Sequence, residues 1–458
     1  MSRPKKKPKA DTGKLIRKAH KYLAEPTELQ EYRMENWIGA LCRLGNESIG
    51  ERKDSYRNTG KGLTYPDQQK ALPGKRKKDP ALCRVQSQVA QDCLHRVDRA
   101  FQKFFADVKA KKSGKKVHIG YPRFKRLEQY KSFTYPQVWM TVKDNKSGIT
   151  KRLARVKFRP VPASKAGGKG KFASLSLPGI GDIKIRLHRP IPWDNAKTVT
   201  VKRCPSGKWH LSITVEMLLD PKLSDKGKKS GVDLGLTKQV ALSDNSYVQY
   251  PKFLKQAEDQ LKQQQRSLCK KEKGSVNYTD HQIVLAKTHE HIANQRQDFL
   301  HKLSLLLVIT YAYIACEKLP IPGMVKNPTL AKAILDSGWG TLIRFVTYKS
   351  VMLRGNRTVT VNPAYTTQDC SRCGYRVPKT LSDRVHKCPQ CGLVLCKHTN
   401  AARNIEQRAF GEVSAYAESS TQTVGPVQPE LVPVVRGEQT PVETRASAAP
   451  ASRGKFCR

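Results

Sequence analysis

Apolar residues recur at three- and four-residue steps in two stretches of the N-terminal half. The first begins after Pro26 and keeps one apolar side over 27–51, and the second runs over 82–104. This period predicts two amphipathic helices whose apolar sides pack into a core. A polar connector rich in Lys, Gly and Pro is expected between them, over 52–79. The basic residues on the second helix are expected either to be solvated or to face nucleic acid.

The pattern then changes to short alternating segments separated by turns that contain Gly and Pro. The segments that read as strands are 152–158, 172–177, 183–187, 199–203 and 209–216. Alternation of this kind predicts an antiparallel sheet or a small barrel, with the two helices flanking it or inserted into it.

Two apolar strands of the C-terminal half each carry a single acid, Asp233 within 231–236 and Glu317 within 313–319. A carboxylate on a buried strand is costly unless it has a partner or a metal. Two such acids from distant segments therefore suggest a shared divalent-metal site of the kind used in phosphodiester hydrolysis. A polar helical hairpin is expected between them over 251–302, and a helix over 327–349 that kinks near Gly338.

Two CxxC pairs follow, Cys370 with Cys373 and Cys388 with Cys391, separated by fourteen residues. Two such turns across a short hairpin supply the four thiolates that tetrahedral Zn²⁺ prefers, and the spacing disfavours four unrelated thiols. With no open position, we interpret the zinc as structural. Cys396 lies just outside and could compete for the metal.

The formal net charge of +47 points to a nucleic-acid partner, because a surface this basic must be neutralised. Aromatic residues interleaved with Arg and Lys can stack on bases while the cations hold phosphates. An ordinary turn and strand with half-buried rings is the alternative. The candidate contacts are Tyr121, Arg123, Phe124, Lys125, Phe133 and Tyr135.

The cysteines outside the two CxxC pairs show no disulfide framework spacing, and no signal peptide is recognised. We therefore expect the protein in the cytoplasm of a bacterium, and on the nucleoid when it is bound to DNA. The longest apolar run, near 303–315, is too short to span a bilayer, which predicts no membrane partner. It is interpreted as a helix end that runs into a buried strand. Residues 1–20 are expected to form a basic disordered arm and 412–458 a disordered tail.

The order of these features resembles the TnpB family, the RNA-guided nucleases of insertion sequences, considered ancestral to type V CRISPR effectors. The resemblance extends over roughly 82–405. The segments that carry it are QSQVAQDCLHRVDRAFQKFF, GYPRFK, SFTYPQ, GVDLGL, LAKAILDSGWGTLIRFVTYKS, the CxxC…CxxC ribbon and NAARNI.

The resemblance implies an α+β multidomain fold. A wedge-type β-barrel over 21–225 would carry an inserted helical recognition region at about 27–110. An RNase H-like (RuvC-like) α/β nuclease domain would follow over 226–411, with the zinc ribbon inserted at 364–395.

The resemblance also implies a guide RNA and a target DNA as partners, with Asp233 and Glu317 as catalytic ligands of Mg²⁺ or Mn²⁺. The family's third acid stands in a DRDxNAA-like motif, where this chain has Cys396-Lys-His-Thr-Asn-Ala-Ala402. His398 thus replaces the metal-binding aspartate. Because Mg²⁺ prefers hard oxygen ligands, we expect RNA-guided DNA binding with impaired cleavage.

Three alternatives stay open. An active nuclease could use His398 as its third ligand. A transposase that joins DNA strands also uses acids of this fold, although the ribbon before the NAA helix argues against it. A plain basic RNA-binding protein would have no use for Asp233.

Overall fold

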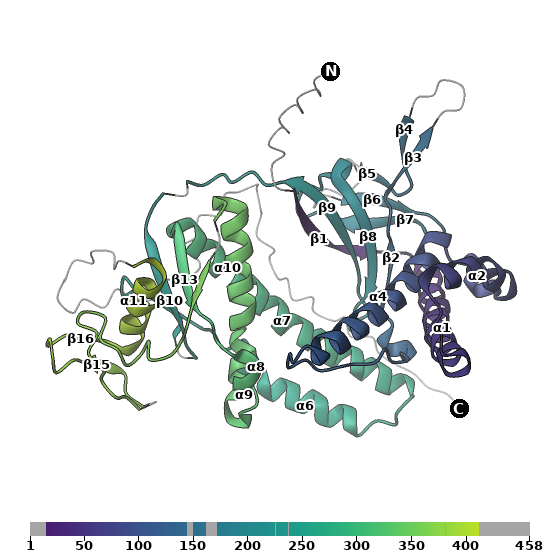
Figure 1. The fold of residues 1–458 in the computed structure, drawn as a ribbon. Coiled ribbons are helices and arrows are strands. Elements are labelled where there is room, and N and C mark those ends of the chain that lie inside the picture. The colour runs from purple at the N-terminus through teal and green to yellow at the C-terminus, as the bar shows by residue number, and fades with distance from the viewer. Residues whose placement is uncertain are drawn as a thin grey trace, which may run out of the picture. The chain divides into compact units, whose positions relative to one another are not determined.

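The computed structural model describes residues 15–411 except 144–149, 162–171, 225, 237, 357 and 381. The described chain divides into two compact units, each with a sheet of its own (Figure 1). The first contains the residues up to Asp220 together with Ala257–Ile292. The second contains Pro221–Gln256 and the residues from Ala293 onward. The division lies close to the domain boundary expected near residue 225. The sequence-based boundaries, however, assign 257–292 to the second domain, whereas these residues belong to the first unit.

The first unit is built on a seven-stranded antiparallel sheet that curves into a half-barrel. The strand order is β2-β8-β9-β1-β7-β6-β5. The strands are β1 (Leu15–Glu25), β2 (Ser132–Tyr135), β5 (Lys157–Val161), β6 (Phe172–Leu177), β7 (Gly181–Arg186), β8 (Ala196–Arg203) and β9 (Trp209–Leu218). A separate hairpin pairs β3 (Trp139–Lys143) with β4 (Thr150–Ala154). Alternate residues of β9 are buried, as the alternating pattern predicts.

One part of the arm prediction is wrong. Residues 15–20, which were expected to be disordered, form the start of β1 and pair with β9. The remaining residues of the predicted arm, 1–14, lie outside the described part of the chain. The same holds for the whole predicted tail, 412–458.

Four helices lie between β1 and β2 in the chain: α1 (Glu28–Thr59), α2 (Tyr65–Lys78), α3 (Pro80–Arg84) and α4 (Ser87–Lys112). Thr27 and Gln30 form a capping box that fixes the start of α1. The predicted polar connector is wrong, because α1 continues to Thr59 and α2 occupies most of the remainder. Leu72 of α2 is buried in the core despite its polar neighbours. Short 3-10 turns lie at Leu127–Gln129 and Trp193–Asn195.

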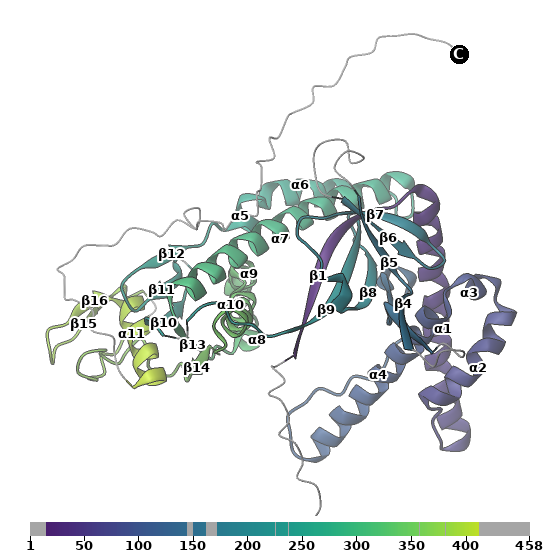
Figure 2. The same cartoon turned by 90° about the horizontal axis from the view of Figure 1, so that it is seen from above.

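The predicted helical hairpin is present. It consists of α6 (Glu258–Cys269), which lies beside α7 (Val276–Thr310), as Figure 2 shows. The apolar end of α7 leads directly into strand β13 (Tyr313–Glu317), which confirms the interpretation of that apolar run. No described helix is both long enough and apolar enough to cross a membrane.

The second unit contains a mixed five-stranded sheet in the order β12-β11-β10-β13-β14. Its other strands are β10 (Lys229–Leu234), β11 (Lys238–Leu242), β12 (Tyr247–Gln249) and β14 (Val359–Val361). The pairs β10–β13 and β13–β14 are parallel, and the remaining pairs are antiparallel. The fold class is therefore mixed α+β, with a half-barrel in one unit and a mixed sheet in the other.

Helices cover both faces of this sheet. One face packs against the second half of α7 and against α9 (Pro328–Ser337) and α10 (Trp339–Arg354) in a large apolar core. The predicted kink is a clean break at Gly338, whose φ of 67° lies in the left-handed region that favours glycine. The opposite face packs against α11 (Lys397–Phe410) through Ala315, Val361 and Ile405. Short helices α5 (Phe253–Gln256) and α8 (Ile321–Met324) complete the unit.

Candidate metal centres

The two predicted acids lie next to each other on neighbouring parallel strands. Val232 of β10 pairs with Cys316 of β13, and Asp233 and Glu317 are the residues that directly follow. Side chains alternate along a strand, so both acids face α11, opposite the apolar core that contains Val232 and Cys316. Both carboxylates are buried, with 5% of Asp233 and 7% of Glu317 exposed.

His398 reaches the same place from the first turn of α11. Its Nδ1 lies 2.6 Å from Oδ2 of Asp233. The structure therefore brings together all three residues that the sequence singled out. Cys396, by contrast, receives a hydrogen bond from Nζ of Lys238 at 3.4 Å and lies outside the cysteine cluster.

The surroundings of Glu317 disfavour its ionised form. Burial, together with the nearby charge of Asp233, raises its pKa to about 7, although the hydroxyl of Thr366 donates to Oε1 and offsets part of that rise. Without a metal, Glu317 is thus close to half protonated at neutral pH. A divalent cation would favour the ionised form of both acids, so this donor pair fits such an ion.

Helix α11 approaches β10 unusually closely because Gly231 has no side chain. A Cβ at Gly231 would lie 1.9 Å from the carbonyl oxygen of Ala402 and 2.7 Å from the amide nitrogen of Glu406. Ala401 and Ala402 are fully buried at this contact. The small residues of GVDLGL and NAARNI therefore set the distance between the helix that carries His398 and the strand that carries Asp233.

Three polar residues of α11 anchor the segment before the cysteine cluster, and the sequence reasoning missed them. Asn400 and Asn404 donate to the carbonyl oxygen of Asp369 at 2.8 and 2.6 Å, and Asn404 also donates to that of Thr366 at 2.8 Å. Arg408 binds the carboxylate of Asp369 at 2.9 Å. Their spacing of four residues, which places them on one helical face, is the signal that could have found them.

The four predicted cysteines form a compact cluster. The sulfur atoms of Cys370, Cys373, Cys388 and Cys391 all lie within 4.8 Å of one another. Within the described part of the chain, this is the one group of three or more His, Cys, Asp or Glu ligand atoms at such spacing. Four thiolates in this arrangement can hold a metal such as zinc. The ligand atoms of Asp233, Glu317 and His398 are farther apart than those of the four cysteines.

The local backbone explains this geometry. Strands β15 (Val385–Lys387) and β16 (Val394–Cys396) form a hairpin whose turn carries the second knuckle, with Cys388 and Cys391. The amides of Gly374 and Gly392 donate to the carbonyl oxygens of Cys370 and Cys388 at 2.9 and 3.0 Å. Both glycines have φ above 70°, so each knuckle requires the conformational freedom of glycine.

The six candidate nucleic-acid contacts separate into two groups. Tyr121, Arg123, Phe124 and Lys125 are exposed, and Tyr121 packs edge-on against Phe101 and Phe104 of α4. Phe133 and Tyr135, however, are only 1% and 2% exposed and belong to the core of the first unit. Their assignment as contacts is corrected, because strand alternation points both rings inward and leaves Ser132 and Thr134 outside.

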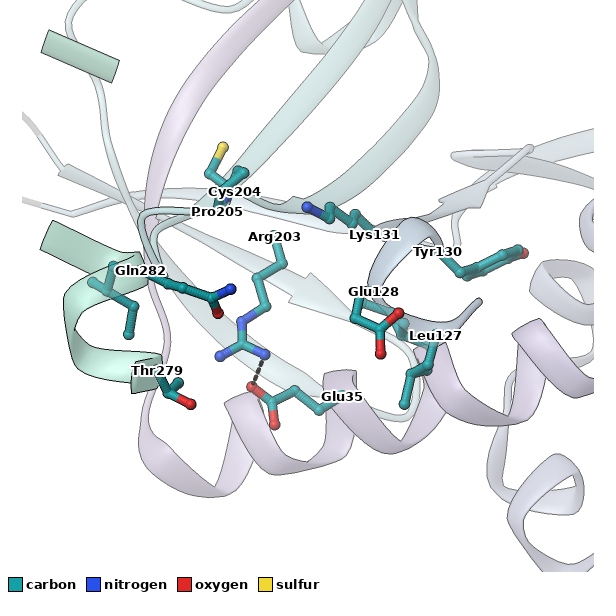
Figure 3. Close-up of a pocket in the computed structure, with 13 residues that line it drawn as sticks. Glu35, Leu127, Glu128, Tyr130, Lys131, Arg203, Cys204, Pro205, Thr279 and Gln282 are labelled. Atoms are coloured by element: carbon teal, nitrogen blue, oxygen red, sulfur yellow. Dashed lines mark ion pairs between the residues drawn. The ribbon is translucent and has the colours of Figure 1, made fainter. Parts of the chain in front are cut away.

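A pocket of about 420 Å³ lies in the first unit, beside the Leu127–Gln129 turn and the start of α7 (Figure 3). Arg203 and Glu35 form an ion pair of 2.8 Å inside it. Lys131 and Glu128 also line the pocket, so its walls carry both signs of charge. None of the predicted metal ligands lies there.

Two family profiles match the chain. One, described as "Probable transposase" of the OrfB_IS605 type, matches residues 212–328, which contain both acids. The other, described as "Cas12f1-like, TNB domain", matches 339–405, which contain the cysteine cluster and His398.

Several relatives match over most of the chain. A "Putative RNA-guided DNA endonuclease" of Streptomyces pristinaespiralis is 28% identical over 85% of this chain and 89% of its own length. "Putative RNA-guided DNA endonuclease InsQ" of Escherichia coli K12 is 26% identical over 84% and 91%. A shorter match is "TnpB-like protein MJ1635" of Methanocaldococcus jannaschii, which is 28% identical over 30% and 31%.

Among solved structures, the mini-RNA-guided endonuclease CRISPR-Cas_phi3 aligns with a TM-score of 0.47 at 10% identity, over 85% of this chain and 92% of its own. The Cas12f1-sgRNA-target DNA complex aligns with a TM-score of 0.29 at 15% identity, over 85% and 99%.

The profiles and the long relatives define a class of transposon-related proteins that includes RNA-guided endonucleases. Within that class, this chain resembles the TnpB family.

Proposed function

We propose that this protein is an RNA-guided DNA-binding protein of the TnpB type whose metal-dependent DNA cleavage is impaired. The observation that carries the proposal is the placement of an imidazole, that of His398, beside Asp233 and Glu317. Two carboxylates and one imidazole offer less negative charge than three carboxylates would.

An RNase H-like (RuvC-like) nuclease fold for the second unit belongs to the same proposal. It is supported by the meander β10–β11–β12 followed by the parallel strands β13 and β14, with one acid on β10 and one on β13. In the first unit, the half-barrel would be the wedge domain, and α1–α4, inserted between β1 and β2, the recognition region.

The proposed partners are a guide RNA and a DNA target. The names of the long relatives describe RNA-guided DNA endonucleases, and the net charge of +47 suits two polynucleotide backbones. Base pairing would supply sequence specificity while the protein recognises the backbone and shape of the heteroduplex. The exposed residues Tyr121, Arg123, Phe124 and Lys125 remain candidate contacts. The use of free cysteines suits the bacterial cytoplasm.

Asp233 and Glu317 would hold the divalent ion, Mg²⁺ or Mn²⁺. When bound, such an ion stabilises charge on the phosphodiester oxygens and lowers the pKa of a coordinated water. Thr366 keeps the Glu317 carboxylate oriented, and α11 closes the site over both acids. Mg²⁺ dehydrates reluctantly and prefers oxygen ligands, so replacing one carboxylate by His398 weakens its binding.

An active nuclease with His398 as the third ligand is the second candidate. It is favoured by the 2.6 Å separation between Nδ1 of His398 and Oδ2 of Asp233, which keeps a nitrogen donor at the site. Mn²⁺ would be the better metal for that donor set, because imidazole suits transition metals more than it suits Mg²⁺.

The test is cleavage of a guide-matched plasmid by the purified protein–RNA complex, in Mg²⁺ and separately in Mn²⁺. We expect guide-dependent binding without cutting for the unmodified protein and recovered cutting for His398→Asp. Asp233→Ala in the His398→Asp background is the control that must abolish the recovered cutting. Cutting by the unmodified protein that Asp233→Ala removes would favour the second candidate. Strand joining without any guide would favour a transposase and contradict both.

The four-cysteine cluster is proposed to hold a structural Zn²⁺. Four sulfur ligands leave no open coordination position, and the segment around them has a core of only a few apolar residues. The metal would replace the core that this segment lacks.

A further inference from the structure

The inner face of β1 carries polar and cationic residues where the other strands of the half-barrel carry apolar ones. Side chains on this face alternate through Lys18, His20 and Tyr22, opposite the buried Val215, Ile213 and Leu211 of β9. Tyr22 is fully buried, His20 is 7% exposed and Lys18 is half-buried. Exposure therefore rises along the strand, from the core outward to Lys18.

The segment that follows β7 adds a second imidazole and a guanidinium. The ring of His188 lies 5.0 Å from that of Tyr22, and the guanidinium of Arg189 lies 5.9 Å from the Tyr22 ring centroid. The Tyr22 hydroxyl lies 3.4 Å from the carbonyl oxygen of Arg189 and 3.3 Å from Nδ1 of His20, and its single proton can be donated to either. His20, His188 and Arg189 thus lie around Tyr22, and Lys18 is close enough to His20 and Arg189 for their charges to interact. We call these four residues the β1 cationic cluster.

Two buried nitrogen atoms of the β1 cationic cluster have no hydrogen-bond partner among the residues that the structure describes. They are Nε2 of His20 and Nε of Arg189. Where the Tyr22 hydroxyl donates to Nδ1 of His20 at 3.3 Å, the N–H of the ring is on Nε2, and this N–H is the group left without a partner. A buried polar atom without a partner destabilises the fold, so such an atom in a native structure calls for a ligand or another explanation.

No acid balances the β1 cationic cluster within the described residues. None of its four members forms an ion pair with a carboxylate there. Burial, together with the charges of Arg189, Lys18 and His188, lowers the pKa of His20 to about 4. By contrast, Arg17, on the opposite face of the same strand, is paired with Glu216 at 3.1 Å.

We propose that the β1 cationic cluster is a binding site for one phosphate group of a polynucleotide. A phosphate offers several acceptor oxygens, which suit a guanidinium, an ammonium and an imidazole N–H at once. Its charge would remove the mutual repulsion of the cluster. Exposed His188 and half-buried Lys18 and Arg189 form the entrance, and His20 forms the floor. The site rests on the proposed function, since the nucleic acid supplies the phosphate.

The first experiment measures thermal unfolding of RNA-free protein in sodium phosphate and in sodium chloride of equal ionic strength. Phosphate is expected to raise the unfolding temperature of the unmodified protein and of Arg17→Gln. Lys18→Gln, Arg189→Gln and His20→Gln are expected to lose this difference, while Lys18→Arg keeps it. The proposal would be overturned if both salts gave the unmodified protein the same unfolding temperature. It would also be overturned if Arg17→Gln lost the phosphate-induced rise in unfolding temperature as the other Gln variants do. Lys18→Gln replaces a half-buried side chain and so guards against a folding defect at His20.

The second experiment measures binding of a labelled 20-nucleotide RNA over a series of KCl concentrations. Lys18→Gln and Arg189→Gln are expected to weaken binding several-fold and to reduce the slope of log affinity against log salt by about 0.7 each. Unchanged RNA binding would overturn the site even if free phosphate stabilises the protein. Equal losses for RNA with a 5′-hydroxyl and a 5′-phosphate assign a backbone phosphate, and a loss confined to 5′-phosphorylated RNA assigns a terminal one; both support the site.

These outcomes are separable from those for the proposed function. Weaker RNA binding by Lys18→Gln, combined with an unmodified protein that no guide directs to DNA, keeps the phosphate site and refutes RNA-guided targeting. If a guide directs the unmodified protein to DNA but the three Gln variants bind RNA as the unmodified protein does, RNA-guided targeting is kept and the phosphate site is refuted.

Discussion

Nδ1 of His398 lies 2.6 Å from Oδ2 of Asp233, on the face of the second unit's sheet that α11 covers. The contact joins residues 165 positions apart in the chain, and Glu317 is the nearby second acid. An imidazole here has two consequences: the site carries one negative charge fewer, and a nitrogen donor replaces an oxygen donor. Both consequences lead to measurable differences in metal binding.

The first prediction concerns His398→Asp in RNA-free protein. A third carboxylate beside Asp233 and Glu317 adds repulsion that lowers the unfolding temperature when no Mg²⁺ is present, and Mg²⁺ should reverse that loss. We therefore expect a larger Mg²⁺-induced rise in unfolding temperature for His398→Asp than for the unmodified protein. His398→Asn, which is neutral, should show no such gain. Equal rises in all three proteins would contradict the account.

The second prediction concerns pH and Glu317. Its pKa rises from the ordinary 4.5 to about 7 on folding, so ionising it opposes folding. Below pH 4.5 the acid is protonated in both states and has no effect. Between pH 4.5 and 7 the unmodified protein should lose stability relative to Glu317→Gln, by about 3 kcal/mol in total.

Denaturant unfolding at several pH values without Mg²⁺, and with the cysteine cluster loaded with zinc, measures that difference. Glu216→Gln is a matched control of opposite sign, because Lys197 and Arg17 lower the pKa of Glu216. Removing the Glu216 carboxylate should lower the free energy of unfolding, and this loss should grow as the pH rises. A pH-independent difference between Glu317→Gln and the unmodified protein would refute the assignment.

The third prediction concerns the contact between β10 and α11. Gly231→Ala places a methyl group against the backbone of Ala402 and Glu406, and backbone cannot rotate away. We expect a loss of about 3 kcal/mol or more in the free energy of unfolding, with α11 displaced from β10. Gly340→Ala in α10 is the matched control, since its new Cβ meets only Ile321 at 3.5 Å. It should be neutral or stabilise by up to about 1 kcal/mol. Similar losses for both variants would contradict the close-packing argument.

The fourth prediction concerns the cysteine cluster. Cys391→Ser should lower the zinc content of the purified protein from one ion to a small fraction, because a hydroxyl is a weak substitute for a thiolate. Proteolysis should then cut between Cys370 and Cys391 at low protease concentrations. Cys83→Ser, at an exposed cysteine outside the cluster, should leave both readouts unchanged. Full zinc content in Cys391→Ser would show that another residue completes the site.

The sequence by itself determined the local features, because each depends on neighbouring residues. CxxC turns with a following glycine fix two ligands within a few residues, so the cluster could be predicted with its members. Apolar periodicity found α4, the glycines at 338 and 340 indicated the break at Gly338, and alternation found most strands of the half-barrel. The acids were recognised because a lone charge in an apolar strand is unusual.

Tertiary structure decided what depends on distant segments. Strand β1 has a polar and basic sequence and is stable only through pairing with β9 and β7, so its start resembled a disordered arm. Alternation places Phe133 and Tyr135 on the same face of β2, but only the packing of α1 against that face, through Trp37, makes it the buried one. The 2.6 Å contact between His398 and Asp233 exists because Gly231 lets α11 approach β10. Pairing and close packing join residues far apart in the chain, and this is why the sequence named the site's members while only the fold set their distances.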